Sequence, residues 1–417
     1  MIISYKFKNF CSYRDNVEFS MKAAASKVRR RFEDNYVTTS TGYDINKICV
    51  IVGENAGGKT NFVRSFEYLK FLLSSNDWIR AYGSTINSNA YEKAKRRNDL
   101  EDEQLRQLFE IEVLINNKIY LYHLEIDRMG IVSEKLDVKK NKTAKYKSVL
   151  DLRRKKILTT HGEEGKKDKL SMVVNISFAG EDKYNEEVIE RMKTEASSGL
   201  FINKLALLAV EEAYSFVDWI NNYFDVISPT INLDFIKAVS GEEEDENIVK
   251  DLRFIEILRM IDYSIAGIEI NEKELYTRTV IVRKRKDGTV FRREIKNDSS
   301  GIGEYFAWAI QIYKVVYKNK CIIADEVDRV LNPVLSDRIV SFINGKQHTG
   351  QFIFTTHNVL HLDLKNYMKE QIYFATKDIE TLESELYSLS DFPEVRYEVT
   401  KIYEFYMKGI LGGVANE

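Results

Sequence analysis

The sequence predicts an α/β protein: a mixed sheet with flanking helices, an added antiparallel β-subdomain and a helical insertion. Three observations lead to this fold. An apolar run at 48–52 leads through a glycine-rich loop into a helical pattern. Two later apolar runs, at 321–324 and 351–354, end in charged or polar residues, as buried parallel strands do. A β-meander is indicated by three short segments of alternating polarity. They span 108–115, 118–126 and 131–138.

Length and composition allow a large core and exclude several classes of protein. Of the 417 residues 44% are hydrophobic, and the 62 basic and 64 acidic side chains leave a net charge of −2. This balance argues against a protein that coats DNA over its whole surface, but it permits a local basic face. The three cysteines form no CxxC pair, so no disulfide framework is expected. Without a secretory leader or an apolar run of about 18 residues, we expect a cytoplasmic protein with no membrane contact.

The chain is expected to divide at residues 150 and 265. Residues 1–150 would carry the glycine-rich loop and the meander, 151–265 a mainly helical insertion, and 266–417 the rest of the first domain. At the N-terminus, the alternation over 1–10 and 17–21 predicts a β-hairpin.

The glycine-rich loop fits G-x-x-x-x-G-K-[ST] from Gly53 to Thr60. Its glycines let backbone N–H groups turn inward around a phosphate, and the following helix adds its positive end. Lys59 would reach the β- and γ-phosphates of ATP, and the Thr60 hydroxyl would bind Mg²⁺. A plain turn would explain the glycines but not the Lys-Thr pair. The predicted ATP-binding residues are Gly53, Glu54, Asn55, Ala56, Gly57, Gly58, Lys59, Thr60 and Asn61.

The segments around this loop have simpler readings. Residues 22–44 are polar and basic and are expected to form a loop over the nucleotide. Apolar residues at helical spacing follow the loop up to Leu73, and 77–106 is charge-dense, which suggests an exposed helical excursion.

Residues 139–169 contain twelve lysines and arginines. Such a run can bind nucleic acid, but it is more often a solvated loop or hairpin. Tyr146 alone is not a stacking platform for bases.

The middle of the chain alternates helical and strand patterns. Residues 186–238 show helical periodicity that includes Phe224, the acidic patch 242–246 suggests a loop tip or helix start, and 251–261 resumes a helix with Leu252 on its apolar face. Two strands at 277–285 and 289–295 would be joined by an Asp-Gly hairpin turn.

The strand 321–324 ends in two carboxylates, Asp325 and Glu326. Because parallel strands end at the same sheet edge, Asp325 would lie near Thr60 and hold Mg²⁺. Glu326 would act as the general base that polarises the attacking water. An ordinary acidic turn is the alternative, and the Lys-Thr pair favours the catalytic reading.

The strand 351–356 leads to His357, and one helix, 333–343, separates it from the acidic strand. Connection rules place His357 at the same sheet edge, within reach of the γ-phosphate. The catalytic residues expected are therefore Lys59, Glu326 and His357.

Ser300 and Gly301 open a helix at 305–318 and form a second potential anion site. A plain serine N-cap is the alternative. Two phosphate-binding helix starts suggest a composite site, in which Lys59 of one subunit and Ser300 with Gly301 of another close on one ATP.

With these motifs in order, the chain resembles the ABC-class ATPases of recombination and chromosome maintenance, of the SMC and RecF type. More narrowly it resembles the stand-alone AAA-family ATPases of bacterial abortive-infection and anti-phage systems, of the Abi-L and Rlo types and the ATPase subunit of the PARIS system. The stretches that carry the resemblance are 7–13, 53–60, 109–112, 299–301, 325–329, 355–358 and 386–392. The resemblance implies an ABC-type P-loop head, an ATP-sandwiched homodimer or higher oligomer, and a role for Asp328 in crossing the dimer interface.

The sequence departs from this pattern at several positions. Gly303 and Glu304 stand where relatives carry Gln and Arg, and Asn332 replaces a frequent histidine. Only Gln104 and Gln107 are candidates for the metal-contacting glutamine. We therefore expect slow or partner-gated hydrolysis of ATP.

Three functions remain open. The leading one, from the resemblance, is an ATP-hydrolysing sensor and scaffold that controls a separately encoded toxic effector, a nuclease or toxin, in anti-phage defence. The 60 residues after His357 are too few for the Toprim nuclease domain of some relatives, so toxicity would belong to another polypeptide. The alternatives are a DNA-binding repair or recombination ATPase and a nucleotide-binding scaffold without turnover.

Overall fold

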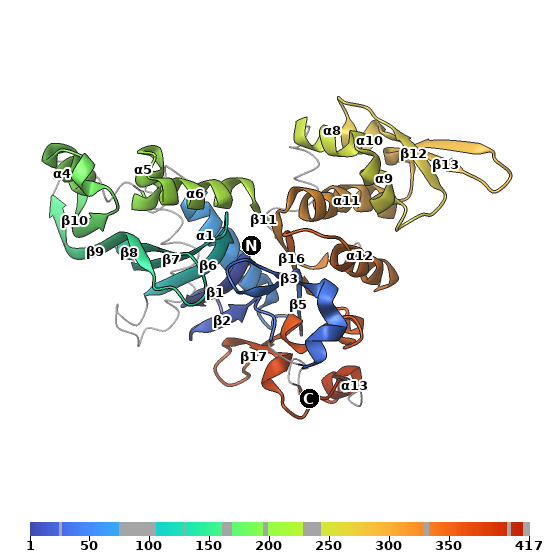
Figure 1. Ribbon diagram of the computed structural model, residues 1–417. Helices are drawn as coiled ribbons and strands as arrows, with labels where there is room; N and C mark the ends of the chain where they lie inside the picture. Colours follow the sequence, from blue (N-terminus) through green and yellow to red (C-terminus); the bar gives the residue numbers. More distant parts are fainter. Residues whose placement is uncertain are drawn as a thin grey trace.

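A six-stranded sheet lies at the centre of the molecule (Figure 1). The computed structural model describes residues 1–24, 27–74, 106–127, 130–160, 169–194, 199–227, 243–327, 333–397 and 402–411. The strand order is β11-β15-β16-β5-β17-β18, parallel from β11 to β17 and antiparallel at β18. The strands are β5 (Ile48–Gly53), β11 (Phe224–Ile227), β15 (Cys321–Ala324), β16 (Gln351–Thr356), β17 (Ile372–Lys377) and β18 (Ser384–Ser388). The predicted mixed sheet is confirmed.

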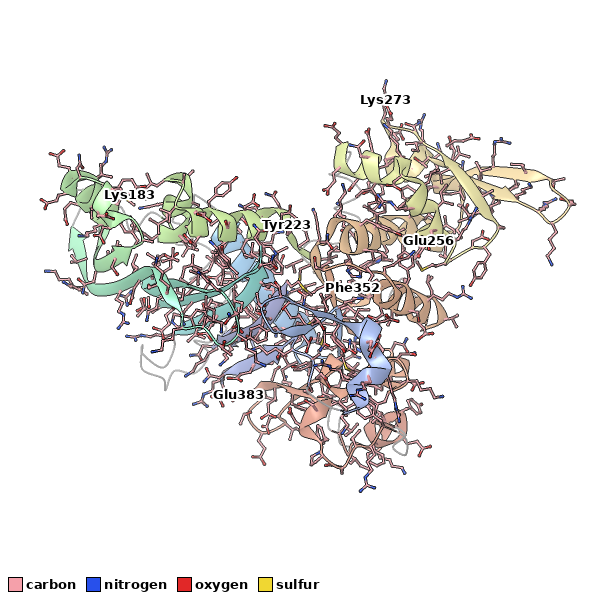
Figure 2. The ribbon with its side chains drawn as sticks, in the orientation of Figure 1. Lys183, Tyr223, Glu256, Lys273, Phe352 and Glu383 are labelled. Atoms are coloured by element: carbon pink, nitrogen blue, oxygen red, sulfur yellow. The ribbon has the colours of Figure 1, made fainter. Side chains whose placement is uncertain are left out.

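The central sheet separates two hydrophobic cores. Side chains of a strand point alternately to opposite faces, so Cys49 and Ile51 of β5 pack in one core while Val50 and Val52 pack in the other. Helix α1 (Lys59–Ser74) lies in the first core; α11 (Ser300–Lys318) and α12 (Pro333–Gly345) lie in the second. Figure 2 shows Phe352 of β16 in this interior. Continuous apolar runs therefore form these strands because both of their faces are buried.

A seven-stranded antiparallel sheet, in the order β10-β9-β8-β7-β6-β1-β2, packs beside this layer. Its strands are β1 (Ile2–Lys8), β2 (Val17–Ser20), β6 (Gln107–Ile115), β7 (Lys118–Asp127), β8 (Gly130–Lys139), β9 (Lys147–Thr160) and β10 (Lys169–Phe178). The predicted hairpin and meander are confirmed. Asn116 and Asn117 have φ of 47° and 60°, the left-handed conformations that a two-residue hairpin turn requires.

The middle of the chain is mainly helical, and it also supplies a strand to the central sheet. Helices α4 (Glu186–Thr194), α5 (Phe201–Leu207) and α6 (Glu211–Asn222) lie over the antiparallel sheet (Figure 1). Phe224, predicted on a helix face, instead begins β11, which pairs with β15. The Phe224 ring packs against α1 and Trp219, and this burial explains why residues 224–227 form a strand. The division of the chain at 150 and 265 stays a proposal.

Helices and a small sheet flank α11 on the other side of the molecule (Figure 1). They are α8 (Glu243–Lys250), α9 (Leu252–Leu258), α10 (Leu275–Arg278), β12 (Ile265–Glu269), β13 (Val280–Lys284) and β14 (Val290–Glu294). The acidic patch begins a helix, as expected, and Gly288 has the positive φ of the predicted turn. The prediction for Leu252 is wrong: it is 83% exposed, and Phe254, Ile257 and Leu258 form the buried face of α9.

The expectation that residues 22–44 cover the nucleotide is wrong for residues 27–35. These form the 3₁₀ segment η1 (Lys27–Asn35), whose Asn35 donates to Gln371 Oε1 at 2.9 Å. Gln371 donates in turn to the carbonyl of Ile48, the first residue of β5. This segment therefore lies at the amino end of the sheet, opposite the glycine-rich loop. The short strands β3 (Tyr36–Thr38) and β4 (Asp44–Asn46) follow it.

The remaining predictions for local structure have mixed outcomes. The C-terminal helix expected from Val395 begins at Ile402 in the described residues, as α13 (Ile402–Met407). The excursion predicted at 77–106 lies outside the described residues except for Arg106. In the part of the chain that the structure describes, no helix is both long and apolar enough to cross a bilayer.

Candidate functional site

The glycine-rich loop connects β5 directly to α1, as predicted. Glycine is required at Gly53 and Gly57 because the carbonyl of Ala375 on β17 lies 2.1 Å and 2.5 Å from where a Cβ atom would stand. Gly58 has φ +115°, a conformation that side chains disfavour. Its carbonyl accepts a hydrogen bond from Tyr13, whose pKa is raised by burial. The loop thus packs against β17 and the N-terminal hairpin.

Lys59 lies inside the loop and is only 5% exposed. Its Nζ donates to the carbonyls of Gly53 and Glu54, each at 2.8 Å. A third neighbour, Nδ1 of His357, lies 3.4 Å from Nζ. The loop therefore already surrounds the ammonium group. On nucleotide binding, its hydrogen bonds to these carbonyls would be replaced by hydrogen bonds to phosphate oxygens.

Thr60 and Asp325 meet at the carboxyl edge of the sheet. Thr60 Oγ1 donates to Asp325 Oδ2 at 2.8 Å, although β16 separates β5 from β15. Asp325 is 9% exposed, and its other oxygen accepts from Thr355 Oγ1 at 2.5 Å. A carboxylate and a hydroxyl, held in contact by strand ends far apart in the chain, converge at the predicted metal position.

This pair of oxygens fits Mg²⁺. Magnesium prefers oxygen ligands and is commonly bound by one or two carboxylates while substrate phosphates and water complete its shell. Among the described residues no group of three or more His, Cys, Asp or Glu side chains could hold a metal by itself. One carboxylate and one hydroxyl are suited to a magnesium ion whose other ligands are nucleotide phosphates and water.

Glu326 directly follows Asp325 and has an unusual backbone conformation. Its φ is 50°, in the left-handed region, which costs a residue with a side chain roughly 1 kcal/mol. Its N–H donates to Thr355 Oγ1 at 2.8 Å. The Thr355 hydroxyl thus contacts the Asp325 carboxylate and the backbone N–H of Glu326. These two hydrogen bonds stabilise the backbone turn between the two acids.

His357 follows β16, which is the neighbour of both β5 and β15. Its contact with Lys59 confirms the prediction that it lies at the same sheet edge. The right-handed crossover rule and a single intervening helix were sufficient for this placement.

Ser300 and Gly301 lie at the start of α11, where Ser299 is the N-cap and accepts a hydrogen bond from the N–H of Ile302. Ser300 is exposed and Gly301 half-buried. In the described part of the chain neither residue hydrogen-bonds to Lys59, Thr60 or Asp325. One copy of the chain therefore does not bring the two predicted phosphate sites into contact.

Five further positions singled out in the sequence differ in outcome. Asn61 donates its side-chain amide to Ser12 Oγ at 2.8 Å, so in this state the amide is engaged with the N-terminal hairpin. Gln107 is buried at the start of β6 and donates to the carbonyl of Asn9 at 2.9 Å. Gln104, Asp328 and Asn332 lie outside the described residues.

Sequence reasoning did not assign roles to several residues of the site. Thr355 is the most important, because it contacts both acids. Its place could have been inferred from the alignment of the two strand ends. Ala324 pairs with Phe354, so the residues that follow them, Asp325 and Thr355, are neighbours. The roles of Ala375 and Tyr13 depend on packing between distant segments, and no local sequence pattern indicates such packing.

In the described residues the basic segment runs from the end of β8 through β9 to the start of β10, and β9 and β10 pair antiparallel. Several of its charges are paired with acids: Lys139 with Glu112, Arg153 with Asp151, and Arg154 with Asp127. Lys145, Lys155 and Lys156 are exposed.

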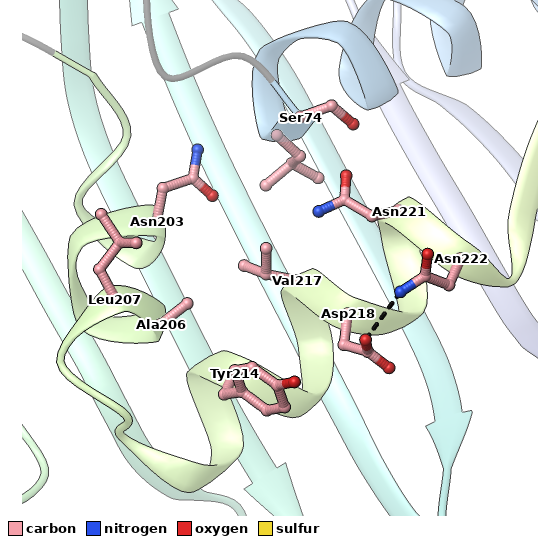
Figure 3. A pocket seen from close by; sticks show the side chains of 10 residues that line it. Ser74, Asn203, Ala206, Leu207, Tyr214, Val217, Asp218, Asn221 and Asn222 are labelled. Carbon is pink, nitrogen blue, oxygen red and sulfur yellow. Dashed lines mark hydrogen bonds between the residues drawn. The ribbon is translucent and has the colours of Figure 1, made fainter.

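A cavity of about 240 Å³ lies elsewhere, between the end of α1 and helices α5 and α6 (Figure 3). Tyr214, Val217 and Asp218 of α6 line one side of it. None of the predicted site residues lines this cavity, so it is separate from the glycine-rich loop.

The parallel sheet, the phosphate loop between β5 and α1, the acids after β15 and the antiparallel sheet have the arrangement predicted for an ABC-type P-loop head. Residues 48–170 match a protein family described as "AAA domain, putative AbiEii toxin, Type IV TA system". The match begins at β5 and extends into β10. A comparison with curated proteins finds none that matches.

Solved structures of SMC heads are similar to this chain over most of its length. The SMC head domain from Thermotoga maritima is 13% identical, with 93% of this chain and 98% of that chain covered and a TM-score of 0.42. An Smc head bound to the C-terminal winged-helix domain of ScpA is 14% identical, with 93% and 97% covered and a TM-score of 0.41. An Smc head with an extended coiled coil, bound to the C-terminal domain of ScpA derived from Pyrococcus furiosus, is 14% identical, with 93% and 96% covered and a TM-score of 0.41.

Proposed function

We propose that this chain binds ATP with Mg²⁺ and hydrolyses it to ADP and phosphate. The observation that carries the proposal is the convergence of Thr60 and Asp325, 2.8 Å apart, beside the Lys59 ammonium and His357. Phosphate-loop ATPases use these residue types at these relative positions.

Each residue has a role that follows from its contacts. The backbone N–H groups of residues 54–60 would surround the β-phosphate, and Lys59 would leave the carbonyls of Gly53 and Glu54 for phosphate oxygens. Thr60 and Asp325 would hold Mg²⁺, which neutralises charge on the phosphates. Glu326 would orient and deprotonate the attacking water, while His357 would donate a hydrogen bond to the γ-phosphate.

We further propose that the complete site needs a second copy of the chain. Ser300 is exposed and Gly301 half-buried at the start of α11, and among the described residues neither hydrogen-bonds to Lys59, Thr60 or Asp325. In a head-to-tail dimer with ATP between the heads, the start of α11 would face the partner's γ-phosphate. Glu304 near that phosphate would repel it, which supports slow or partner-gated hydrolysis.

Mixing two inactive variants tests this arrangement. Lys59→Met and Ser300→Arg should each lack Mg²⁺-dependent phosphate release when pure. Random mixing makes about half of the dimers mixed, and each mixed dimer has one intact site of two, so we expect roughly a quarter of the wild-type rate. Failure of the mixture to regain activity, with both variants folded, would contradict the shared site while leaving hydrolysis by the wild type open to direct measurement.

For the cellular role we propose a sensor and scaffold that controls a separately encoded toxic effector in anti-phage defence. The matched family, whose description names a toxin and a type IV toxin–antitoxin system, supports a defence setting. The alternative role is a DNA-binding ATPase of repair or recombination.

The genes on either side of the coding sequence separate these roles. We expect a neighbouring nuclease or toxin that is harmful when expressed alone and that co-purifies with a tagged copy of this chain. Neighbouring replication genes, with no harmful product and no co-purifying protein, would favour the alternative.

A further inference from the structure

A strongly basic and exposed feature of the structure is the β-ribbon that contains the predicted Asp-Gly turn. It comprises β13, the turn and β14, residues 280–294, and is called here the basic ribbon. It carries six Lys or Arg side chains and two acids, in a chain whose net charge is −2. Positive charge is therefore concentrated in a short segment.

The outer part of the ribbon is exposed on both faces. Figure 1 shows it extending away from α9 and α11. The third strand of this sheet, β12, pairs with β13 only up to Arg283, at the base. Residues 284–293 are all exposed. A two-stranded ribbon of this kind is thin enough to enter a groove of another molecule.

The charges at the tip are not neutralised locally. Within the described residues Lys284, Arg285 and Lys286 form no ion pair, whereas Arg292 lies 2.8 Å from Glu269. The one acid of the tip, Asp287, accepts hydrogen bonds from the N–H and the hydroxyl of Thr289. Charges on an edge strand can serve only to prevent unwanted strand pairing. That explanation does not account for Arg285 and Lys286, because they lie in the turn, where no strand could pair.

Exposed apolar side chains lie beside the basic residues of the ribbon. Phe291 is 38% exposed and Val290 48% exposed. The guanidinium of Arg293 lies 4.9 Å from the centre of the Phe291 ring. In the major groove of duplex DNA an apolar ring such as Phe291 can contact the methyl group of thymine, while basic groups beside it contact phosphates.

The base of the ribbon is fixed. Arg283 lies 2.7 Å from both Asp262 and Asp298, and these ion pairs are largely removed from solvent. Asp298 immediately precedes Ser299, the N-cap of α11. The ribbon is therefore held in one direction relative to the helix that opens with Ser300.

We propose that the basic ribbon is a binding site for duplex DNA, with its two strands in the major groove and Lys284, Arg285 and Lys286 on the flanking phosphates. The major groove of B-form DNA admits a two-stranded β-ribbon. The corresponding groove of duplex RNA is too deep and narrow for side chains to enter. This site is distinct from the segment 139–169, and it rests on no step of ATP hydrolysis.

The test is the affinity of the full chain, without nucleotide, for a fluorescent 25-base-pair DNA duplex, measured by anisotropy as a function of salt. The triple variant Lys284→Glu, Arg285→Glu and Lys286→Glu should bind at least about 10-fold more weakly at low salt, and its slope of log affinity against log salt should fall by up to about 2.7. The matched control is Lys145→Glu, Lys155→Glu and Lys156→Glu, which changes the net charge equally; Lys145 lies between β8 and β9, and the other two lysines lie in β9. It should change the affinity less than 3-fold. Phe291→Ala, which keeps every charge, should also weaken binding.

Three results would overturn the proposal. They are absence of salt-dependent binding by the wild type, equal losses in the two triple variants, and equal competition by duplex RNA or by an acidic polyglutamate peptide. The last would identify a general anion surface. Unchanged melting temperatures show that both triple variants are folded.

Discussion

Glu326→Gln is expected to reduce ATP hydrolysis by at least about 100-fold while ATP still binds. Glutamine keeps the size of the side chain but cannot take a proton from water. The backbone turn at Glu326, held by Thr355, does not depend on the carboxylate. Phosphate release under single-turnover conditions and binding of a fluorescent ATP analogue measure the two effects separately.

A matched control is Glu256→Gln on α9, an exposed acid paired with Lys346 (Figure 2). It removes the same charge and should leave hydrolysis unchanged. If the wild type and Glu326→Gln show the same negligible rate, the chain is a nucleotide-binding scaffold rather than an enzyme.

Lys59→Met is expected to weaken ATP binding by about 100-fold or more and to abolish hydrolysis. The change removes the cation closest to the predicted phosphates, and a charge-assisted contact of this kind contributes roughly 1.5–3 kcal/mol for each hydrogen bond. It also leaves the carbonyls of Gly53 and Glu54 without their donor, so unfolding of the variant should become easier by about 1–3 kcal/mol. Calorimetric titration with Mg²⁺ and ATP, and denaturant unfolding, check the two parts.

The other end of β5 offers a closely matched control. Lys47 is also buried, and its Nζ donates to the carbonyls of Asn344 and Lys346 at 2.8 Å and 2.9 Å. Lys47→Met should therefore cost a similar free energy of unfolding and leave ATP affinity unchanged. Equal loss of ATP affinity in the two variants would mean that Lys59 acts only through the stability of the loop.

The site could be predicted from the sequence to the extent that strand ends define it. The apolar runs before Gly53, Asp325 and His357 fix three parallel strands, and the carboxyl ends of parallel strands share one edge. Predictions failed where position depends on packing. The prediction for Phe224 is wrong because aromatic residues at helical spacing fit either a helix or a short buried strand. The prediction for residues 27–35 is wrong because a polar loop carries no signal for the end of the sheet on which it lies.

By itself the sequence determined the phosphate loop after β5, the acids after β15 and the histidine after β16. Each of them depends on a local pattern in which an apolar run is followed by a turn or polar residues. Only the tertiary structure decided that Thr355 joins Asp325 to the backbone of Glu326, that Ala375 forces glycine at Gly53, and that the basic ribbon stands clear of the helices beside it. The physical reason is that these relations join residues far apart in the chain. Their distances are set by the packing of the two cores, and no local spacing records them.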